Sequence, residues 1–380
     1  MLTYQMETVD TQHILETLNL DRTWMNEARQ RQARFWRREK LEHCPIGVSA
    51  PLTKAQQAWP NPNQAEAFHS PQAMLFQQLR AVAGVINARS DAVPSMRANL
   101  GTGICLATLG LKQKVFADKM PWLQEHLSLE QAKALKPEDI RIQGDFARGL
   151  EMIRFFREVL EDAVPVYCMD TQGPFDLAHL ILGDQIFLLM YDDPGLLHHV
   201  LEFALELGIK THEWMKEVIG EPLTEHHHSN GLYARNMGIR ICEDTSALLR
   251  EDAIDTFVIP YTRRLAAHFG GAWVHYCGRN DALTRRICEC DEIRGINFGH
   301  LPENKNPHDL DADMALIEKH GKIYYGGWPR EPGESGSAYL KRLHRWAEKG
   351  TMLFCGGNAA IGGANGFHDY REVMEYWYSL

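Results

Sequence analysis

The chain has 380 residues, 44% of them hydrophobic and 24% charged, and its formal net charge is −10. Acidic and basic residues are interleaved, which argues against the concentrated basic face needed to bind nucleic acid or an anionic membrane. Met1–Gln12 has neither a basic nor an apolar run, and the most apolar stretch, Phe175–Tyr191, is interrupted by Asp176, His179 and Asp184. We therefore expect no secretory signal, no membrane span and a cytoplasmic location, in which the eight cysteines are reduced thiols or metal ligands.

Residues 1–43 are predicted to form an N-terminal helical extension ahead of a catalytic domain over residues 44–380. Thr11–Lys40 is rich in Gln and Arg, and it offers Trp24 and Phe35 for packing. The pattern favours a solvated helix that packs on the domain. A lid and the arm of a homodimer are the alternatives.

The first part of the domain contains three runs that predict strands: Pro45–Ser49, Val164–Met169 and Gly238–Cys242. Glu225–His228 is placed at or near the end of a further strand. Its three consecutive histidines favour hydrogen bonding at a strand end or in a loop over a second metal site. Ile254–His268 is predicted to be a helix that is kinked at Pro260.

The second half alternates strands and helices in a regular rhythm. The predicted strands are Ala272–Tyr276, Ile293–Phe298, Lys322–Tyr325 and Thr351–Phe354. The helices that follow them are Asp281–Cys290, Leu310–His320, Ser337–Lys349 and Asp369–Tyr378. Such βα units predict a parallel sheet, and their number approaches the eight of a (β/α)8 TIM barrel. A doubly wound open sheet is the alternative, but no Gly-x-Gly-x-x-Gly follows the first strand.

Three residues at strand ends predict a metal site. His275 and Cys277 lie two apart in one strand and so face the same side, and Cys355 ends the last strand. In a barrel, the carboxyl ends of the strands form the rim where active sites lie. Two thiolates and one imidazole form a catalytic zinc set that leaves one coordination position open.

Other polar residues are expected near the same rim. Asp170 and Asp244 follow predicted strands and are candidate catalytic groups that hold or deprotonate a substrate, although an Asp at a strand end is often a helix cap. His300 and Glu303 are candidates for a fourth zinc ligand or its hydrogen-bonding partner. Cys288 and Cys290 could form a rival cluster with His275 and Cys277, but residues two apart in a helix do not face each other. We interpret both as structural.

These residues resemble a motif of a known family. His275-Tyr-Cys277-Gly278, followed by Cys355, is similar to the zinc motif of corrinoid-dependent methyltransferases in the uroporphyrinogen decarboxylase superfamily. The resemblance covers roughly residues 95–358 and includes further segments. These are Asn99–Gly103, Gln172–Ala178, Glu243-Asp244 and Phe257–Arg264. It implies methyl transfer between a corrinoid and a thiol, a methyl ether or a methylamine-type small molecule.

Two departures from the superfamily's pattern bear on the expected substrate. Its decarboxylases carry an arginine-bearing loop after the first strand, whereas no Arg occurs here between Arg38 and Arg80 and Lys54 is a poor clamp for a polyanion. Gly356–Gly366 lacks the proline-containing pattern of the relatives. No Asp-x-His-x-x-Gly is present to bind a corrinoid, so the cofactor is expected on a partner protein. The alternatives are a decarboxylase-like lyase acting on a smaller acid and a non-catalytic binding protein.

Overall fold

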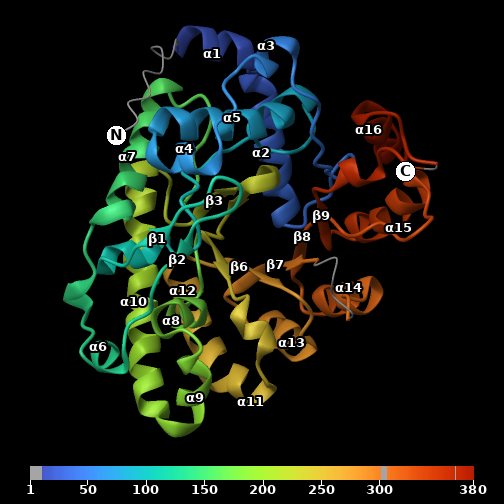
Figure 1. Ribbon diagram of the computed structural model, residues 1–380. Coiled ribbons are helices and arrows are strands. Elements are labelled where there is room, and N and C mark those ends of the chain that lie inside the picture. The colour runs from blue at the N-terminus through green and yellow to red at the C-terminus, as the bar shows by residue number, and fades with distance from the viewer. Residues whose placement is uncertain (1–10, 301–305, 364) are drawn as a thin grey trace.

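The computed structural model describes residues 11–300, 306–363 and 365–380. Its centre is a five-stranded parallel sheet in which each strand pairs with the next along the chain (Figure 1). The strands are β5 (Ile239–Cys242), β6 (Ala272–Cys277), β7 (Ile293–Gly299), β8 (Ile323–Gly326) and β9 (Met352–Phe354). All are mostly buried runs of apolar and aromatic residues, as expected for parallel strands covered on both faces. The α/β class predicted from the sequence is confirmed.

The helices of the second half begin at polar caps and end close to the predicted positions. They are α13 (Asp281–Glu289), α14 (Leu310–Lys319), α15 (Gly336–Glu348) and α16 (Tyr370–Ser379). Asn280, Asp309, Ser335 and Asp369 accept backbone hydrogen bonds at their first turns. These caps fix where each helix leaves the loop that follows its strand, and so they shape the edge of the sheet that carries the candidate site.

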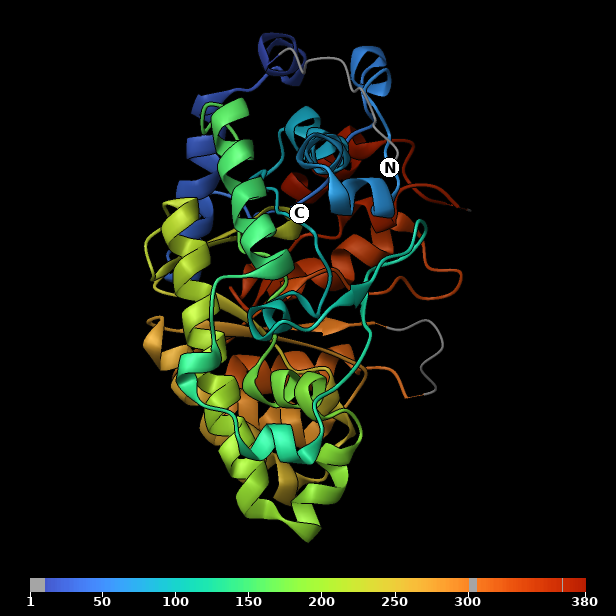
Figure 2. The ribbon, with the colours of Figure 1, turned by 60° about the vertical axis from the view of Figure 1, so that its left-hand side comes forward.

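The first half is mainly helical. After α1 (Thr11–Leu18) and α2 (Arg22–Trp36) come α3 (Lys54–Gln57), α4 (Gln64–His69), α5 (Pro71–Ala88), α6 (Leu129–Lys133), α7 (Gly144–Val159), α8 (Pro174–Leu182), α9 (Gln185–Asp192) and α10 (Pro194–Ile219). A small hairpin, β1 (Gln113–Lys114) with β2 (Trp122–Leu123), interrupts them. In Figure 2 the long helices α7 and α10 lie along the outside of the molecule. No helix of the described ranges is both long and apolar enough to cross a membrane.

The predicted strands Pro45–Ser49 and Val164–Met169 are extended but form no regular ladder. Ile46 makes a single parallel bridge to Phe354, and Met96 makes one to Val166. Pro45 and Pro165 have no N–H to donate, which limits pairing on either side of them. The regular sheet therefore has five strands, and these two segments join its surroundings through isolated hydrogen bonds.

The Glu225–His228 segment does form a strand, but not one of the parallel sheet. As β3 it pairs antiparallel with β4 (Leu232–Arg235), which corrects the expectation that it ends a further βα strand. The hairpin packs on α2, and Gln32 of α2 donates to the Gly231 carbonyl and accepts from the Tyr233 N–H. Gln32 thus provides the hydrogen bonds that a neighbouring strand would otherwise supply.

The predicted helix over residues 254–268 is confirmed, with a π-helical turn just before Pro260. The described chain forms α11 (Glu251–Ala253), a π-helical turn at Ile254–Val258 and then α12 (Ile259–His268). Pro260 has no N–H to donate to the preceding turn of a continuous α-helix. The chain has an irregular, π-helical turn directly before it.

Candidate metal centre

His275 and Cys277 lie on one face of β6, at its carboxyl end. Their alternation along the strand brings the His275 Nε2 to 3.6 Å from the Cys277 Sγ. Two ligands of one tetrahedral zinc ion, at ordinary Zn–N and Zn–S lengths, are about 3.5 Å apart. The spacing of these two atoms therefore fits a shared zinc ion, and both side chains are only partly buried.

Asn297 fixes the protonation of the His275 ring. Asn297 lies opposite His275 on β7, and its Oδ1 is 2.5 Å from His275 Nδ1. Its Nδ2 donates to the Tyr325 carbonyl, which can only accept, so Oδ1 must face the imidazole. Nδ1 then carries the proton and Nε2 presents its lone pair towards Cys277. This is the tautomer that a metal-bound histidine needs, and sequence reasoning missed Asn297.

Gly299 provides the space for the thiol of Cys277. The two residues are paired across β6 and β7, and a Cβ on Gly299 would lie 2.3 Å from the Cys277 Sγ. No real side chain tolerates that contact. The neighbouring strand thus supports the centre twice, through the Asn297 amide and through the absence of a side chain at residue 299.

Asp244 follows β5 and faces the same two residues. Its Oδ1 accepts the Cys277 N–H at 2.7 Å and lies 3.9 Å from His275 Nε2. Cys242, Asp244 and His275 each place a possible ligand atom within 4.8 Å of the others. The described residues thus bring the predicted catalytic Asp244 to His275 and to the backbone of Cys277, and they add Cys242, which sequence reasoning did not consider. Neither the Cys277 thiol nor Cys355 belongs to this group of described residues.

Two buried acidic residues, Asp176 and Glu243, hold the backbone around Asp244 in place. The Asp176 carboxylate accepts the N–H groups of Asp244 and Thr245, each at 2.9 Å, and burial together with the nearby Asp244 raises the pKa of Asp176 to about 7. Glu243 is fully buried and accepts from Thr262 and Ser246, and burial raises its pKa well above the ordinary value. These contacts position the loop that carries Asp244.

Cys355 directly follows β9, as predicted, and its Cα lies against Gly47. Burial raises the pKa of Cys355 to about 12, while a hydrogen bond with Tyr325 acts in the opposite direction. Cys355 also lines a cavity of about 220 Å³ together with Tyr167 and Ser229. Burial likewise raises the pKa of Cys277 to about 12, with Asp244 adding to the effect. Without a cation, both thiols therefore keep their protons at neutral pH. Cys355 stays a predicted ligand.

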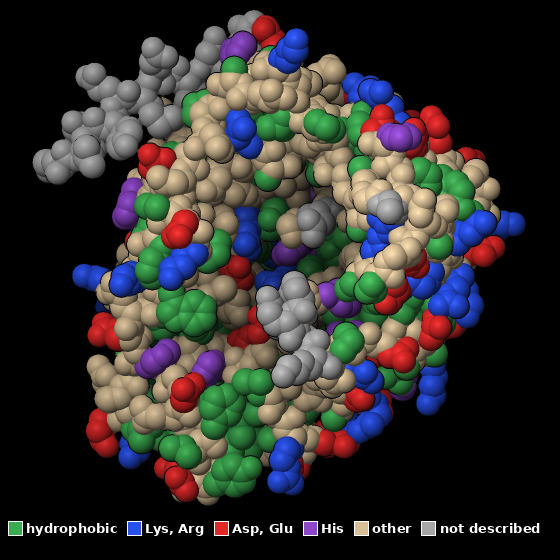
Figure 3. Space-filling view, turned by 45° about the vertical axis from the view of Figure 1, so that its right-hand side comes forward, with side chains coloured by type: hydrophobic (Ala, Val, Ile, Leu, Met, Phe, Trp, Pro, Cys, Tyr) green, Lys and Arg blue, Asp and Glu red, His purple; other side chains and the backbone are tan. Residues whose placement is uncertain are grey.

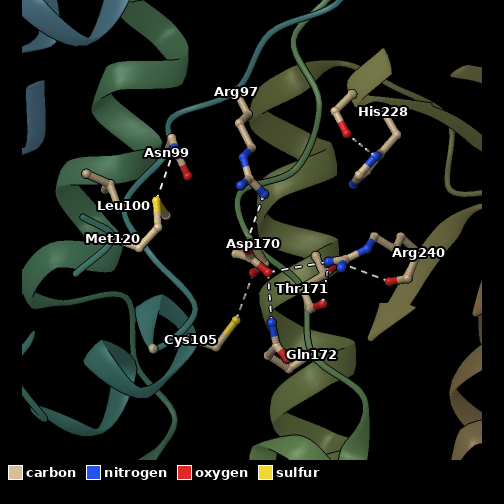
Figure 4. Close-up of polar contacts among 12 residues, drawn as sticks. Arg97, Asn99, Leu100, Cys105, Met120, Asp170, Thr171, Gln172, His228 and Arg240 are labelled. Carbon is tan, nitrogen blue, oxygen red and sulfur yellow. Dashed lines mark hydrogen bonds and ion pairs between the residues drawn. The ribbon is translucent and has the colours of Figure 1, made fainter. Parts of the chain in front are cut away.

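Asp170 is the centre of a buried ion-pair cluster (Figure 4). Its carboxylate contacts Arg97 at 3.1 Å and Arg240 at 3.4 Å, and it accepts from Gln172 at 2.8 Å. Burial opposes its charge, but the two guanidinium groups prevail and hold the pKa of Asp170 below the ordinary value. A carboxylate held in this way is a poor proton acceptor, and its ion pairs hold the two arginines in place. The catalytic role of Asp170 stays a prediction.

Figure 3 shows a hollow in one face of the molecule, with basic, acidic and histidine side chains in and around it.

Among the remaining predicted residues, His300 contacts the Tyr324 hydroxyl at 3.2 Å and stacks edge-on with Trp328. Burial lowers the pKa of His300 to about 4. Glu303 lies outside the described residues. Cys288 and Cys290 are buried, and Cys290 donates to the Arg286 carbonyl at 3.1 Å, in keeping with a structural role.

Comparison with known proteins gives a likeness of fold. No protein-family model and no curated protein sequence matches the chain. Among solved structures, a methyltransferase from Methanosarcina mazei is similar with a TM-score of 0.62. The sequence identity is 17%, over 86% of this chain and 91% of that chain. At this identity the match establishes a shared architecture across nearly the whole of both chains.

Proposed function

We propose that the chain is a zinc-dependent methyltransferase that works with a corrinoid on a partner protein. The observation that carries the proposal is the pair His275 Nε2 and Cys277 Sγ, 3.6 Å apart, with the imidazole tautomer set by Asn297. Support comes from the shared architecture with a methyltransferase and from the resemblance of the His-x-Cys…Cys motif to the zinc branch of the uroporphyrinogen decarboxylase superfamily.

The complete (β/α)8 barrel belongs to the same proposal. Single hydrogen bonds already link the extended segments beside the sheet: Asp91 N–H to Ile46, Met96 N–H to Pro165 and Gly173 N–H to Cys242. Together with the bridges at Ile46 and Met96, they connect segments on both edges of the five-stranded sheet. A ring of eight segments accounts for these contacts, with the regular ladders confined to one side.

In this proposal His275, Cys277 and Cys355 hold the zinc ion, and Asp244 or Cys242 is near enough to His275 to take part. When bound, zinc stabilises the thiolate form of a thiol or activates a heteroatom that carries the methyl group. Asp244 is half exposed beside the pair and can accept the proton that a substrate thiol releases. Arg97 and Arg240, held by Asp170, give the interior a positive charge.

The partner is proposed to be a corrinoid protein that presents its cofactor at the hollow in Figure 3. The second reactant is a small molecule, either a methyl donor or a thiol acceptor. One observation favours a second candidate, a decarboxylase-like lyase acting on a small acid. Arg97 and Arg240 outnumber the carboxylate between them and could hold an acid group, and zinc would then be unnecessary.

Metal analysis of purified protein separates the two candidates. We expect one zinc per chain, lost in Cys277→Ser and reduced in Cys355→Ser, and retained in Cys288→Ser, whose thiol is buried in α13. Demethylation of methylcobalamin by added thiols should follow the zinc content. A zinc-free protein whose stability is unchanged by Cys277→Ser and Cys355→Ser contradicts the methyltransferase proposal and leaves the lyase.

A further inference from the structure

A polar cavity of about 580 Å³ lies between α2 and the β3–β4 hairpin. It shares no lining residue with the candidate metal centre. One wall is formed by α2 and its C-cap residue, with the polar side chains of Asn26, Arg29, Gln30, Arg34 and Arg37 along it. Several of the Gln and Arg side chains in which this segment is rich therefore line a concave surface.

The hairpin forms the opposite wall. The Tyr233 ring packs against the His227 ring at 4.8 Å, and the guanidinium of Arg29 lies 5.9 Å from the centre of the same Tyr233 ring. The three consecutive histidines are divided by strand alternation: His227 faces this wall, while the rings of His226 and His228 approach Trp273. Stacking and alternation therefore hold the wall of the cavity in place.

The charges in this cavity are not balanced. Arg34 and Arg37 share the carboxylate of Glu39, and Arg235 pairs with Glu225 at 3.3 Å. Under the wall, Glu221 is neutralised by Lys216 at 2.8 Å.

Arg29 is the exception among these arginines. Within the described part of the chain it has no hydrogen bond and no ion pair, although it is half-buried and its Nε is shielded from water. Burial lowers the pKa of Arg29, and the nearby Tyr233, Glu225 and Glu221 offset this effect only in part.

We propose that this cavity is a binding site for a small phosphorylated molecule, separate from the proposed methyl-transfer centre. One unpaired guanidinium and three more that share only two carboxylates leave an excess positive charge that an anion of more than one charge would neutralise, and phosphate oxygens match the guanidinium fork. The amides of Asn26 and Gln30 can bond hydroxyl groups of the ester. A cavity of this volume suits a metabolite of moderate size.

Isothermal titration calorimetry of the full-length protein tests the site with glycerol 3-phosphate, and with glycerol and succinate for comparison. We expect saturable binding of glycerol 3-phosphate, weaker binding of succinate and none of glycerol. Arg29→Met keeps the aliphatic stem but removes the charge, and should weaken binding by about tenfold or more. Arg37→Met, on the exposed side of the cavity, should weaken it less. Arg250→Met, an exposed arginine outside the cavity, is the control and should leave binding unchanged.

Thermal unfolding of the unmutated protein gives a second readout that does not depend on any variant. Glycerol 3-phosphate should raise the Tm in a saturable manner, because a ligand that binds only the folded state stabilises it. The proposal is overturned by an absence of saturable binding and of any Tm shift up to about 10 mM ligand. It is equally overturned by tighter binding of succinate than of the phosphate ester, or by equal weakening in Arg29→Met and Arg250→Met.

Discussion

The amide of Asn297 and the imidazole of His275 form one hydrogen-bonded unit across two paired strands. Because the Asn297 Nδ2 donates to the Tyr325 carbonyl at 2.5 Å, its Oδ1 is left to accept from His275 Nδ1. The backbone of β8 thereby determines, through one side chain, which nitrogen of His275 is free to bind a metal. A strand that contributes no predicted ligand still sets the chemistry of the centre.

Asn297→Leu should weaken zinc binding by about 10- to 100-fold while His275 and Cys277 remain in place. Leucine cannot accept the Nδ1 proton, so the ring is free to rotate and to change tautomer. The affinity is measured by competition with a chromophoric chelator. Asn87→Leu is the matched control, since it also removes amide hydrogen bonds, but between α5 and the loop at Pro51. Equal zinc affinity in both variants would contradict the role of Asn297.

Gly299→Ala should displace the Cys277 thiol and lower the zinc content of the purified protein. The added Cβ would lie 2.3 Å from Sγ, and the side chain of Cys277 must then turn away from His275. Gly195→Ala is the control, because its nearest neighbour is Asp193 Oδ1 at 3.5 Å, an ordinary contact. Zinc content is read by atomic emission. If the two variants retain the same amount of zinc, the lack of a side chain at residue 299 does not matter for metal binding.

Asp170→Asn should destabilise the protein by about 3 kcal/mol, because it leaves Arg97 and Arg240 buried without a counter-charge. Urea unfolding at neutral pH measures the free energy. The exposed Asp252→Asn should change it by no more than about 0.5 kcal/mol. A loss for Asp170→Asn as small as that of Asp252→Asn would show that the two arginines are hydrated in the folded protein.

His212 should make the protein sensitive to acid. Burial lowers the pKa of His212 to about 4, and its Nδ1 lies 2.6 Å from the Gly208 carbonyl, so the folded state holds the neutral ring. The folded pKa lies below the unfolded value of about 6.5. The stability from the neutral ring is therefore present above pH 6.5 and is lost as the pH falls towards 4, by up to about 3 kcal/mol.

The test is urea unfolding at pH 7 and at pH 4.5, compared between the natural protein and His212→Gln. The variant cannot gain this proton and should lose less stability between the two pH values. His69→Gln, at an exposed position in α4, serves as the control and should behave like the natural protein. Identical acid losses in all three proteins would exclude His212 as a source of the sensitivity.

Sequence patterns located the second half of the fold well because its strands are short, apolar and separated by helices with clear caps. They predicted strands at Pro45–Ser49 and Val164–Met169, where the structure has extended chain with isolated bridges. Proline limits strand pairing there, and hydrophobic periodicity alone does not show this effect. The Glu225–His228 hairpin was misplaced because antiparallel pairing with Leu232–Arg235 depends on a turn and on Gln32, about two hundred residues away.

For the site, spacing of two along a strand was enough to place His275 beside Cys277. The supporting residues were out of reach for a different reason. Asn297, Arg97 and Arg240 act across strands, and the register that brings them to their partners is a tertiary property. The ion pairs of Asp170 with Arg97 and Arg240 could likewise not be predicted, because nothing near Asp170 in the sequence indicates these two partners.

The pairing of β6 with β7 gives the centre a signature that a linear motif does not capture. His275 is opposite Asn297 and Cys277 is opposite Gly299, so His-x-Cys on one strand is matched by Asn-x-Gly on the next. Each half is common by itself. A search for distant relatives can require both halves, separated by one helix. It then selects for the two predicted ligands, for the hydrogen-bond acceptor of the histidine and for the space beside the cysteine thiol. Such a search could recognise this centre where overall sequence similarity has faded.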